Sequence, residues 1–232
     1  MTGHREHPII FSGAMLLAIM EGRKTQTRRV MRKQPFILDL GDDRHGPKTP
    51  HWVIDYSDQR KRSAWKVGES PYWTDCPYGG PGDRLWVKEE WWPAFKRTET
   101  NNGCAYRSDY LRPALLGLDH TIANERYWRG PVLMPRWASR IALEVLSVRA
   151  QQLQEITAED AIAEGIPQSA GEAAALGLID LAKTPGHEWD NRTSVENFAL
   201  AWDRINSKRV PWATNPWVWV LTFRRLDDGE GR

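Results

Sequence analysis

The segment Arg23-Lys24-Thr25-Gln26-Thr27-Arg28-Arg29 holds the residue types best suited to chemistry. It places four cationic side chains and two hydroxyls within seven residues. Lys24 and Thr27 lie three positions apart, so their side chains can meet if the backbone turns helically, and the arginines can grip a phosphate. A solvated basic turn is the plain alternative, because most runs of charge face solvent. The segment is thus a candidate for catalysis or for phosphate binding.

A second candidate is a carboxylate at the end of a short helix expected over residues 158–164. Glu159 and Asp160 lie in the first turn of this helix, where negative charge favours the helix dipole, and both are interpreted as structural. Glu164 lies at the opposite end, where a negative charge is unfavourable, and Gly165 follows it. Most glutamates are surface groups, so Glu164 is a functional candidate only in combination with other polar groups.

Thirteen tryptophans are an unusual number for 232 residues. Such residues either anchor a core or offer flat faces on which bases, sugars or cations stack. Trp202 and one of Trp217 and Trp219 are expected in the core. Trp91 and Trp92 cannot both point inward on a continuing strand, so at least one of them is expected to face a groove.

The elements that must position these residues are short. Residues 8–11 predict a strand, and Ser12 caps a helix that ends at Gly22 and delivers the chain to the basic segment. Further strands are expected at 85–89, where Trp86 points outward, at 140–149 and at 216–223, and a helix follows Ser194. Short strands separated by loops, with helices that do not alternate regularly with them, favour an α+β fold with a curled sheet.

Composition limits the architecture and the function classes. At roughly 150 residues per domain, the length favours one enlarged domain, here taken as residues 1–232. Irregular stretches at about 34–75, 91–130 and 167–192 are interpreted as insertions into this domain. The chain is 41% hydrophobic and 27% charged, as folded proteins are, and its net charge is +2. Any contact with nucleic acid must therefore use a local basic patch.

The sequence indicates neither a membrane nor a metal partner. No apolar run near the start approaches the roughly 20 residues of a membrane span, and no signal-peptide pattern is present, so a cytoplasmic protein is expected. Cys76 and Cys104 form no CxxC pair, and the six histidines form no HxxxH pair. We therefore expect reduced thiols and no metal or other cofactor.

Taken together, the motifs resemble those of the ASCH domain, a small β-barrel related to the PUA domain. Gly22, Lys24 and Arg29 occupy the signature positions of its GxKxxxxR motif. The order of the expected elements agrees, and the segments CPYGGPGDRLWVKEEW, MPRWASRI and NPWVWV resemble a longer phage and prophage form. The resemblance spans most of the chain outside the insertions. It implies a PUA-like α+β barrel with short helices and long loop insertions.

One branch of this family, the small bacterial N4-acetylcytidine amidohydrolases, has a proposed active set of a Lys, a Thr three positions later and a Glu near the end of a following helix. The resemblance assigns these catalytic positions to Lys24, Thr27 and Glu164. Lys24, made neutral by burial or by the cations of Arg28 and Arg29, would take the proton of Thr27. Glu164 would orient the lysine or protonate the departing amine, while Arg29 or a backbone amide holds the oxyanion. The products would be cytidine and acetate.

The chain is about twice as long as those amidohydrolases, and the added material could form a lid or a second binding surface. Other ASCH proteins are thought to bind RNA, so a noncatalytic RNA- or DNA-binding module is the main alternative, and a ribonuclease is another. The expected partner is a nucleoside, or an RNA or DNA containing modified cytosine. Apart from the catalytic set, the residues expected to contact it are Gly22, Arg23, Arg28, Arg29, Trp86 and Trp91. A closed pocket sized for one pyrimidine would favour the enzyme, and an open basic groove the binding module.

Overall fold

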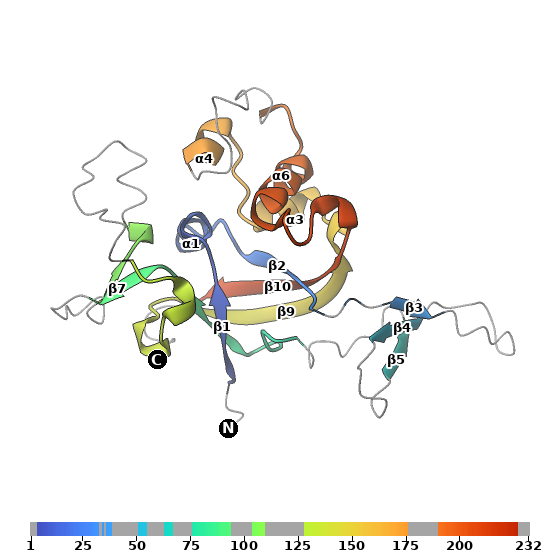
Figure 1. Ribbon diagram of the computed structural model, residues 1–232, viewed down its shortest axis with the longest axis horizontal. Helices are drawn as coiled ribbons and strands as arrows, with labels where there is room; N and C mark the ends of the chain where they lie inside the picture. Colours follow the sequence, from blue (N-terminus) through green and yellow to red (C-terminus); the bar gives the residue numbers. More distant parts are fainter. Residues whose placement is uncertain are drawn as a thin grey trace, which may run out of the picture.

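The computed structural model describes residues 4–32, 34, 36–38, 51–54, 63–66, 76–93, 104–109, 128–175 and 190–226. Its main layer is a five-stranded mixed sheet with the strand order β1-β6-β9-β10-β2 (Figure 1). β1 and β6 pair in parallel, whereas the other neighbours are antiparallel. The strands are β1 (Glu6–Ile10), β2 (Gln26–Val30), β6 (Arg84–Lys88), β9 (Ala142–Gln152) and β10 (Trp217–Arg225).

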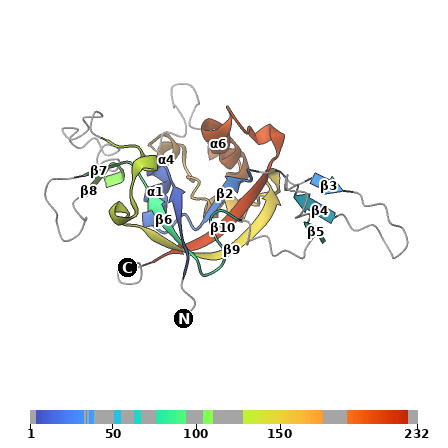
Figure 2. The same cartoon turned by 60° about the horizontal axis from the view of Figure 1, so that its bottom comes forward.

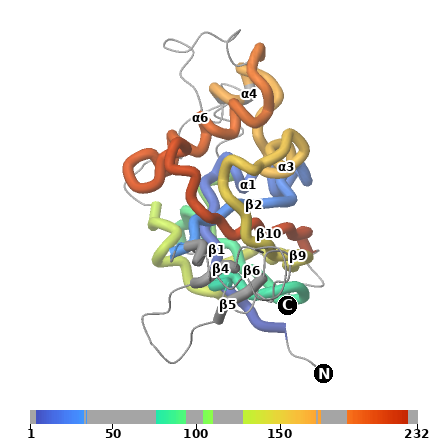
Figure 3. The backbone as a smooth tube through the Cα atoms, turned by 90° about the vertical axis from the view of Figure 1, so that its right-hand side faces the viewer, coloured from blue at the N-terminus to red at the C-terminus, as the bar shows by residue number. Residues whose placement is uncertain are grey.

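The α-helices lie in the half of the molecule away from the N-terminus in all three views (Figures 1, 2 and 3), and they pack on both faces of the sheet. The α-helices are α1 (Gly13–Met20), α3 (Ala158–Ala163), α4 (Ala170–Ala175) and α6 (Ser194–Asn206). Single 3₁₀ turns are η3 (Pro131–Leu133), η4 (Arg136–Ala138), η5 (Leu153–Glu155) and η6 (Trp212–Thr214). None of the described helices combines the length and the apolarity that crossing a bilayer requires.

Two smaller sheets lie within the stretches that the sequence marks as insertions. β3 (Phe36–Leu38), β4 (His51–Ile54) and β5 (Ser63–Lys66) form an antiparallel three-stranded sheet. β7 (Trp91–Pro93) and β8 (Cys104–Tyr106) form an antiparallel pair. The stretches therefore contain short strands of their own rather than loop alone.

β10 is buried on both faces, which explains its nearly continuous apolar sequence. Its residues Trp219, Leu221 and Phe223 belong to one core cluster, together with apolar side chains of β1, α1, β6 and β9. Val218 and Val220 belong to a second cluster, under α3 and α6. The expectation that Trp202 and one tryptophan of this strand lie in the core is confirmed, because Trp202 and Trp219 are both buried.

The expected α+β class is confirmed, but the described strands do not close into a barrel. β1 and β2 are the two edges of the main sheet, and α1 carries the chain from one edge to the other. A side-chain hydrogen bond connects these two edges in place of strand pairing. Arg29 Nη2 on β2 donates this bond, of 2.6 Å, to the carbonyl of Ile10 on β1. The sheet is thus curled enough for its two ends to touch.

Candidate functional site

The turn after α1 fixes the backbone position of Lys24. Gly22 adopts a left-handed conformation, with φ of 75°, that ordinary residues rarely take. The amides of Arg23 and Lys24 then both donate to the carbonyl of Ala18, and the amide of Thr25 donates to Ala163 at the end of α3. These bonds tie the ends of two helices, far apart in the chain, to the same short segment.

A glycine lets α3 approach this segment closely. Gly165 has φ of 79°, and a Cβ added to it would lie 2.9 Å from the Cβ of Lys24 and 3.0 Å from that of Ala18. Real Cβ atoms do not come this near to other atoms, so any larger residue would push the end of α3 away. The glycine next to Glu164 thus sets the distance between Glu164 and Lys24.

Glu164 lies between two buried cations. Lys24 Nζ donates to Glu164 Oε2 at 2.8 Å and to the backbone carbonyl of the same residue at 2.7 Å. Arg28 Nη1 donates to Oε1 at 3.2 Å. The side chains of Lys24, Glu164 and Arg28 are 1%, 5% and 0% exposed. Two candidates that lie 140 residues apart, Lys24 and Glu164, are therefore in direct contact.

A second carboxylate, Asp160, supports this arrangement from the preceding turn of α3. Arg28 Nη2 donates to its Oδ2 at 2.6 Å, Gln26 Nε2 donates to its Oδ1 at 2.9 Å, and Arg149 pairs with both oxygens at 3.0 Å. Burial acts to raise the pKa of Asp160, but the hydrogen bonds from Gln26 and Arg28 and the charge of Arg28 lower it overall. Asp160 is therefore more than a residue that favours the helix dipole.

Burial and the neighbouring charges act on the pKa of Lys24 in opposite directions. Burial is the largest influence and lowers the pKa of Lys24 from its usual value. Glu164 opposes this effect through its charge and hydrogen bond, while the charges of Arg29 and Arg28 lower the pKa further. The amine can thus lose its proton more readily than an exposed lysine, as a general base at neutral pH requires.

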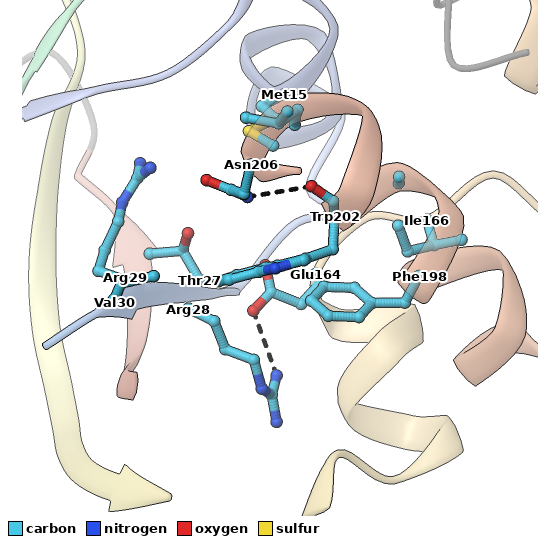
Figure 4. Close-up of a pocket in the computed structure, with 12 residues that line it drawn as sticks. Met15, Thr27, Arg28, Arg29, Val30, Glu164, Ile166, Phe198, Trp202 and Asn206 are labelled. Carbon is cyan, nitrogen blue, oxygen red and sulfur yellow. Dashed lines mark hydrogen bonds and ion pairs between the residues drawn. The ribbon is translucent and has the colours of Figure 1, made fainter. Parts of the chain in front are cut away.

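A pocket of about 100 Å³ lies between β2, α1 and α6 (Figure 4). Thr27 and Arg29 extend from β2 on the side that faces Asn206 and Met15, whereas Arg28 extends on the opposite side (Figure 4). The lining residues are Met15, Thr27, Arg28, Arg29, Val30, Glu164, Ile166, Phe198, Ala201, Trp202, Ile205 and Asn206. Lys24 is not part of this lining and meets the pocket only through Glu164.

Thr27 is the alcohol of this site. It is 2% exposed, and within the described residues its hydroxyl has no hydrogen-bond partner, Lys24 included. Since the hydroxyl neither donates to nor accepts from a neighbouring side chain, it remains available to a ligand in the pocket. The structure thus brings Thr27 and Glu164 to one pocket. Lys24 lies behind the lining and contacts Glu164.

Of the residues predicted to contact the ligand, Arg28 and Arg29 line the pocket, whereas the other four lie outside it. Gly22 is exposed, and Arg23 pairs with Glu21 at 2.7 Å on the surface. Trp86 lies on β6, and Trp91 is 3% exposed in a separate apolar cluster with residues of β8 and η4. Trp91 is therefore a packing residue rather than a free face for a base.

Sequence reasoning missed the contribution of α6. Trp202 was expected only as a core residue, yet it forms a wall of the pocket together with Phe198. Asn206 adds a polar group to this wall, and its Nδ2 donates to the carbonyl of Trp202 at 3.2 Å (Figure 4). The only available signal was the four-residue spacing of Trp202 and Asn206, which places them on one helix face.

The described residues contain no cluster of three or more His, Cys, Asp or Glu side chains that could hold a metal ion. Cys76 and Cys104 are both buried and form no disulfide. Comparison of the chain with models of known families, with curated proteins and with solved structures finds no match.

Proposed function

We propose that the protein is an amidohydrolase that removes the acyl group from N4-acylated cytosine, converting N4-acetylcytidine to cytidine and acetate. The observation that carries this proposal is that Thr27 and Glu164 line one pocket, while Lys24 contacts Glu164 from behind the lining. The resemblance of the GxKxxxxR segment to the ASCH signature supports the same assignment, as does the α+β class with a curled sheet. A PUA-like barrel is part of the proposal.

The residues have the chemical properties that the reaction needs. Thr27 Oγ1 attacks the acyl carbon and forms an ester, while its proton passes to neutral Lys24. The bond between the acyl carbon and N4 breaks as cytidine leaves, and Lys24 returns the proton to the N4 amine. Water then hydrolyses the ester and releases acetate. Arg29 Nη atoms, on the same side of β2 as Thr27, stabilise the negative charge that develops on the acyl oxygen.

Proton transfer requires a closer approach of Lys24 to Thr27 than the unliganded pocket has. Lys24 Nζ is directed at Glu164 and forms no hydrogen bond with Thr27 Oγ1. Catalytic hydrogen bonds often tighten only when substrate is bound, and a water molecule can also relay the proton. Glu164, which contacts the lysine and lines the pocket, is placed to hold the amine in the required orientation.

Size and burial favour an enzyme over a nucleic-acid-binding module. The pocket volume of about 100 Å³ is of the same order as a cavity of about 150 Å³ that accepts a benzene ring. A surface that binds the backbone phosphates of a nucleic acid needs exposed cations, whereas Lys24 and Arg28 are buried in ion pairs with carboxylates. These two cations are thus already paired inside the protein and are not exposed to a nucleic-acid backbone.

The test is an assay of the purified protein with N4-acetylcytidine, with cytidine followed by chromatography. Thr27→Val removes the hydroxyl at nearly constant volume, and Lys24→Met removes the amine. Both variants should lose activity by about 100-fold or more, as expected for a lost nucleophile or general base. Thr25→Val, at an exposed neighbouring threonine, is the matched control and should retain activity. Turnover that persists in both Thr27→Val and Lys24→Met would refute the proposed site.

A further inference from the structure

Arg29 differs from every other cation of the site in its partners. Its Nη2 donates to the carbonyl of Ile10, and its guanidinium carbon lies 4.9 Å from the centroid of the Phe11 ring. Its Nε is buried and has no hydrogen-bond partner. Among the described residues, no carboxylate forms an ion pair with Arg29. Its positive charge therefore has no ion-pair partner there, although Glu164 acts on it through space, and the side chain lines the pocket.

The neighbouring carboxylates are already engaged by other cations. Lys24 and Arg28 both pair with Glu164, and Arg28 and Arg149 both pair with Asp160. Two carboxylates are thus already paired with three cations other than Arg29. An anionic group that enters the pocket would meet a positive charge in a partly desolvated place, where charge-assisted hydrogen bonds are strongest.

The opposite side of the pocket is mainly apolar. Phe198, Trp202 and Ile205 of α6 and Met15 of α1 line it. The Trp202 indole Nε1 is already satisfied by the carbonyl of Val210 at 2.9 Å, so the ring offers apolar surface rather than a donor. A ligand that fits both sides has a flat, weakly polar body and a small negatively charged group.

We propose that Arg29 forms a subsite for an oxyanion, either a carboxylate or a phosphate, at the β2 side of the pocket. The inference rests on the proposed function in that it concerns the same pocket, but anion binding requires no turnover. The oxyanion has two possible sources. One is the carboxylate that deacylation releases. The other is the 5′-phosphate of a nucleotide that binds with its phosphate, in place of the acyl oxygen, at Arg29, which would make a cytidine nucleotide a better ligand than the nucleoside.

The experiment measures binding to the full chain by isothermal titration calorimetry at constant ionic strength. The probes are sodium acetate, inorganic phosphate, cytidine and cytidine 5′-monophosphate. At least one of acetate, phosphate and the nucleotide should bind to the wild-type protein, and its affinity should fall about 10- to 100-fold in Arg29→Gln, the range for a hydrogen bond to a charged group. Cytidine affinity should change less.

Arg225→Gln is the matched control, because Arg225 is an exposed arginine that also donates to one backbone carbonyl, that of Met20, at 3.2 Å. It should bind every probe as the wild-type protein does. Arg29→Lys keeps the charge and should retain part of the affinity, which separates the role of charge from a general effect on folding. Nucleotide binding that exceeds cytidine binding by tenfold or more identifies the phosphate as the ligand group, whereas acetate binding alone identifies the carboxylate.

Two outcomes would overturn the subsite. One is a wild-type protein that binds neither acetate, phosphate nor the nucleotide, and this result needs no variant. The other is equal affinity for all anions in Arg29→Gln and in the wild-type protein. The proposed function fails separately: anion binding that depends on Arg29 in a protein that does not hydrolyse N4-acetylcytidine would support the subsite and refute the hydrolase.

Discussion

Replacing Glu164 with glutamine tests whether the buried ion pairs hold the site together. The substitution keeps the size of the side chain and one oxygen acceptor but removes the charge between Lys24 and Arg28. Loss of one partner from a buried ion pair costs about 3–5 kcal/mol of unfolding free energy. Arg28 keeps its pair with Asp160, so the charge left uncompensated is mainly that of Lys24. We therefore expect a loss near the low end, about 3 kcal/mol at pH 7.

The loss should shrink as the pH rises. Burial lowers the pKa of Lys24, so between this lowered pKa and the ordinary value of about 10.4 the unfolded chain binds more protons than the folded one. Stability linked to this residue therefore rises with pH across that window. Without Glu164 the pKa falls further, because the charge and hydrogen bond that raised it are gone. Glu164→Gln should thus gain more stability than the wild-type protein between pH 7 and pH 10.

The assay is urea unfolding followed by tryptophan fluorescence at several pH values. Glu21→Gln is the matched control, since Glu21 pairs with Arg23 at 2.7 Å with both side chains about one-third exposed. Such a surface pair contributes about 0–1 kcal/mol. The reasoning is refuted if Glu164→Gln destabilises the protein no more than Glu21→Gln does, or if its deficit grows as the pH rises.

Three further variants or treatments test other parts of the structure. Gly165→Ala should lower the unfolding free energy by about 1–3 kcal/mol, because the residue has positive φ and its new Cβ would meet Lys24; an unchanged urea midpoint would contradict the close approach. Asp160→Asn should cost about 1–3 kcal/mol at pH 7 by weakening the hold on Arg28. Because the pKa of Asp160 is lowered on folding, its stabilisation is present above pH 4 and lost as the pH falls through the folded pKa, so the deficit of the variant should narrow in acid. Burial raises the pKa of the Cys76 thiol to about 11, so iodoacetamide at pH 8 should modify it only after unfolding, and rapid labelling of the native protein would show that the thiol is accessible.

Local sequence signals were sufficient for the elements that carry the site. The helix start at Ser12 and the glycine at position 22 correctly predict α1 and the turn after it, and the short helix expected over residues 158–164 corresponds to α3. The contact between Lys24 and Glu164 depends on two segments 140 residues apart. No periodicity indicates such a contact, and it was expected only through the resemblance to a family with a Lys, Thr and Glu at those positions.

The parts that sequence reasoning missed depend on tertiary packing. Asp160 has the residue type and position of a helix-dipole carboxylate, and only the placement of β2 beside α3 reveals that it pairs with Arg28. Trp91 has the composition of a stacking residue, but β8 and the segment after residue 128 cover it. Whether β1 and β2 pair or remain edges depends on the curl of the whole sheet, which no local pattern specifies.

The position of β2 in the sheet determines when this strand can pair during synthesis and folding of the chain. Among the described strands, β2 pairs with β10 alone, with Val30 opposite Val218, so the strand that carries Thr27 and Arg29 gains its neighbour from far along the chain. Such high contact order slows folding, because a long loop must close before the pairing contributes. A nascent chain on the ribosome therefore holds β2 unpaired through most of translation, and ligand binding must await the synthesis of β10.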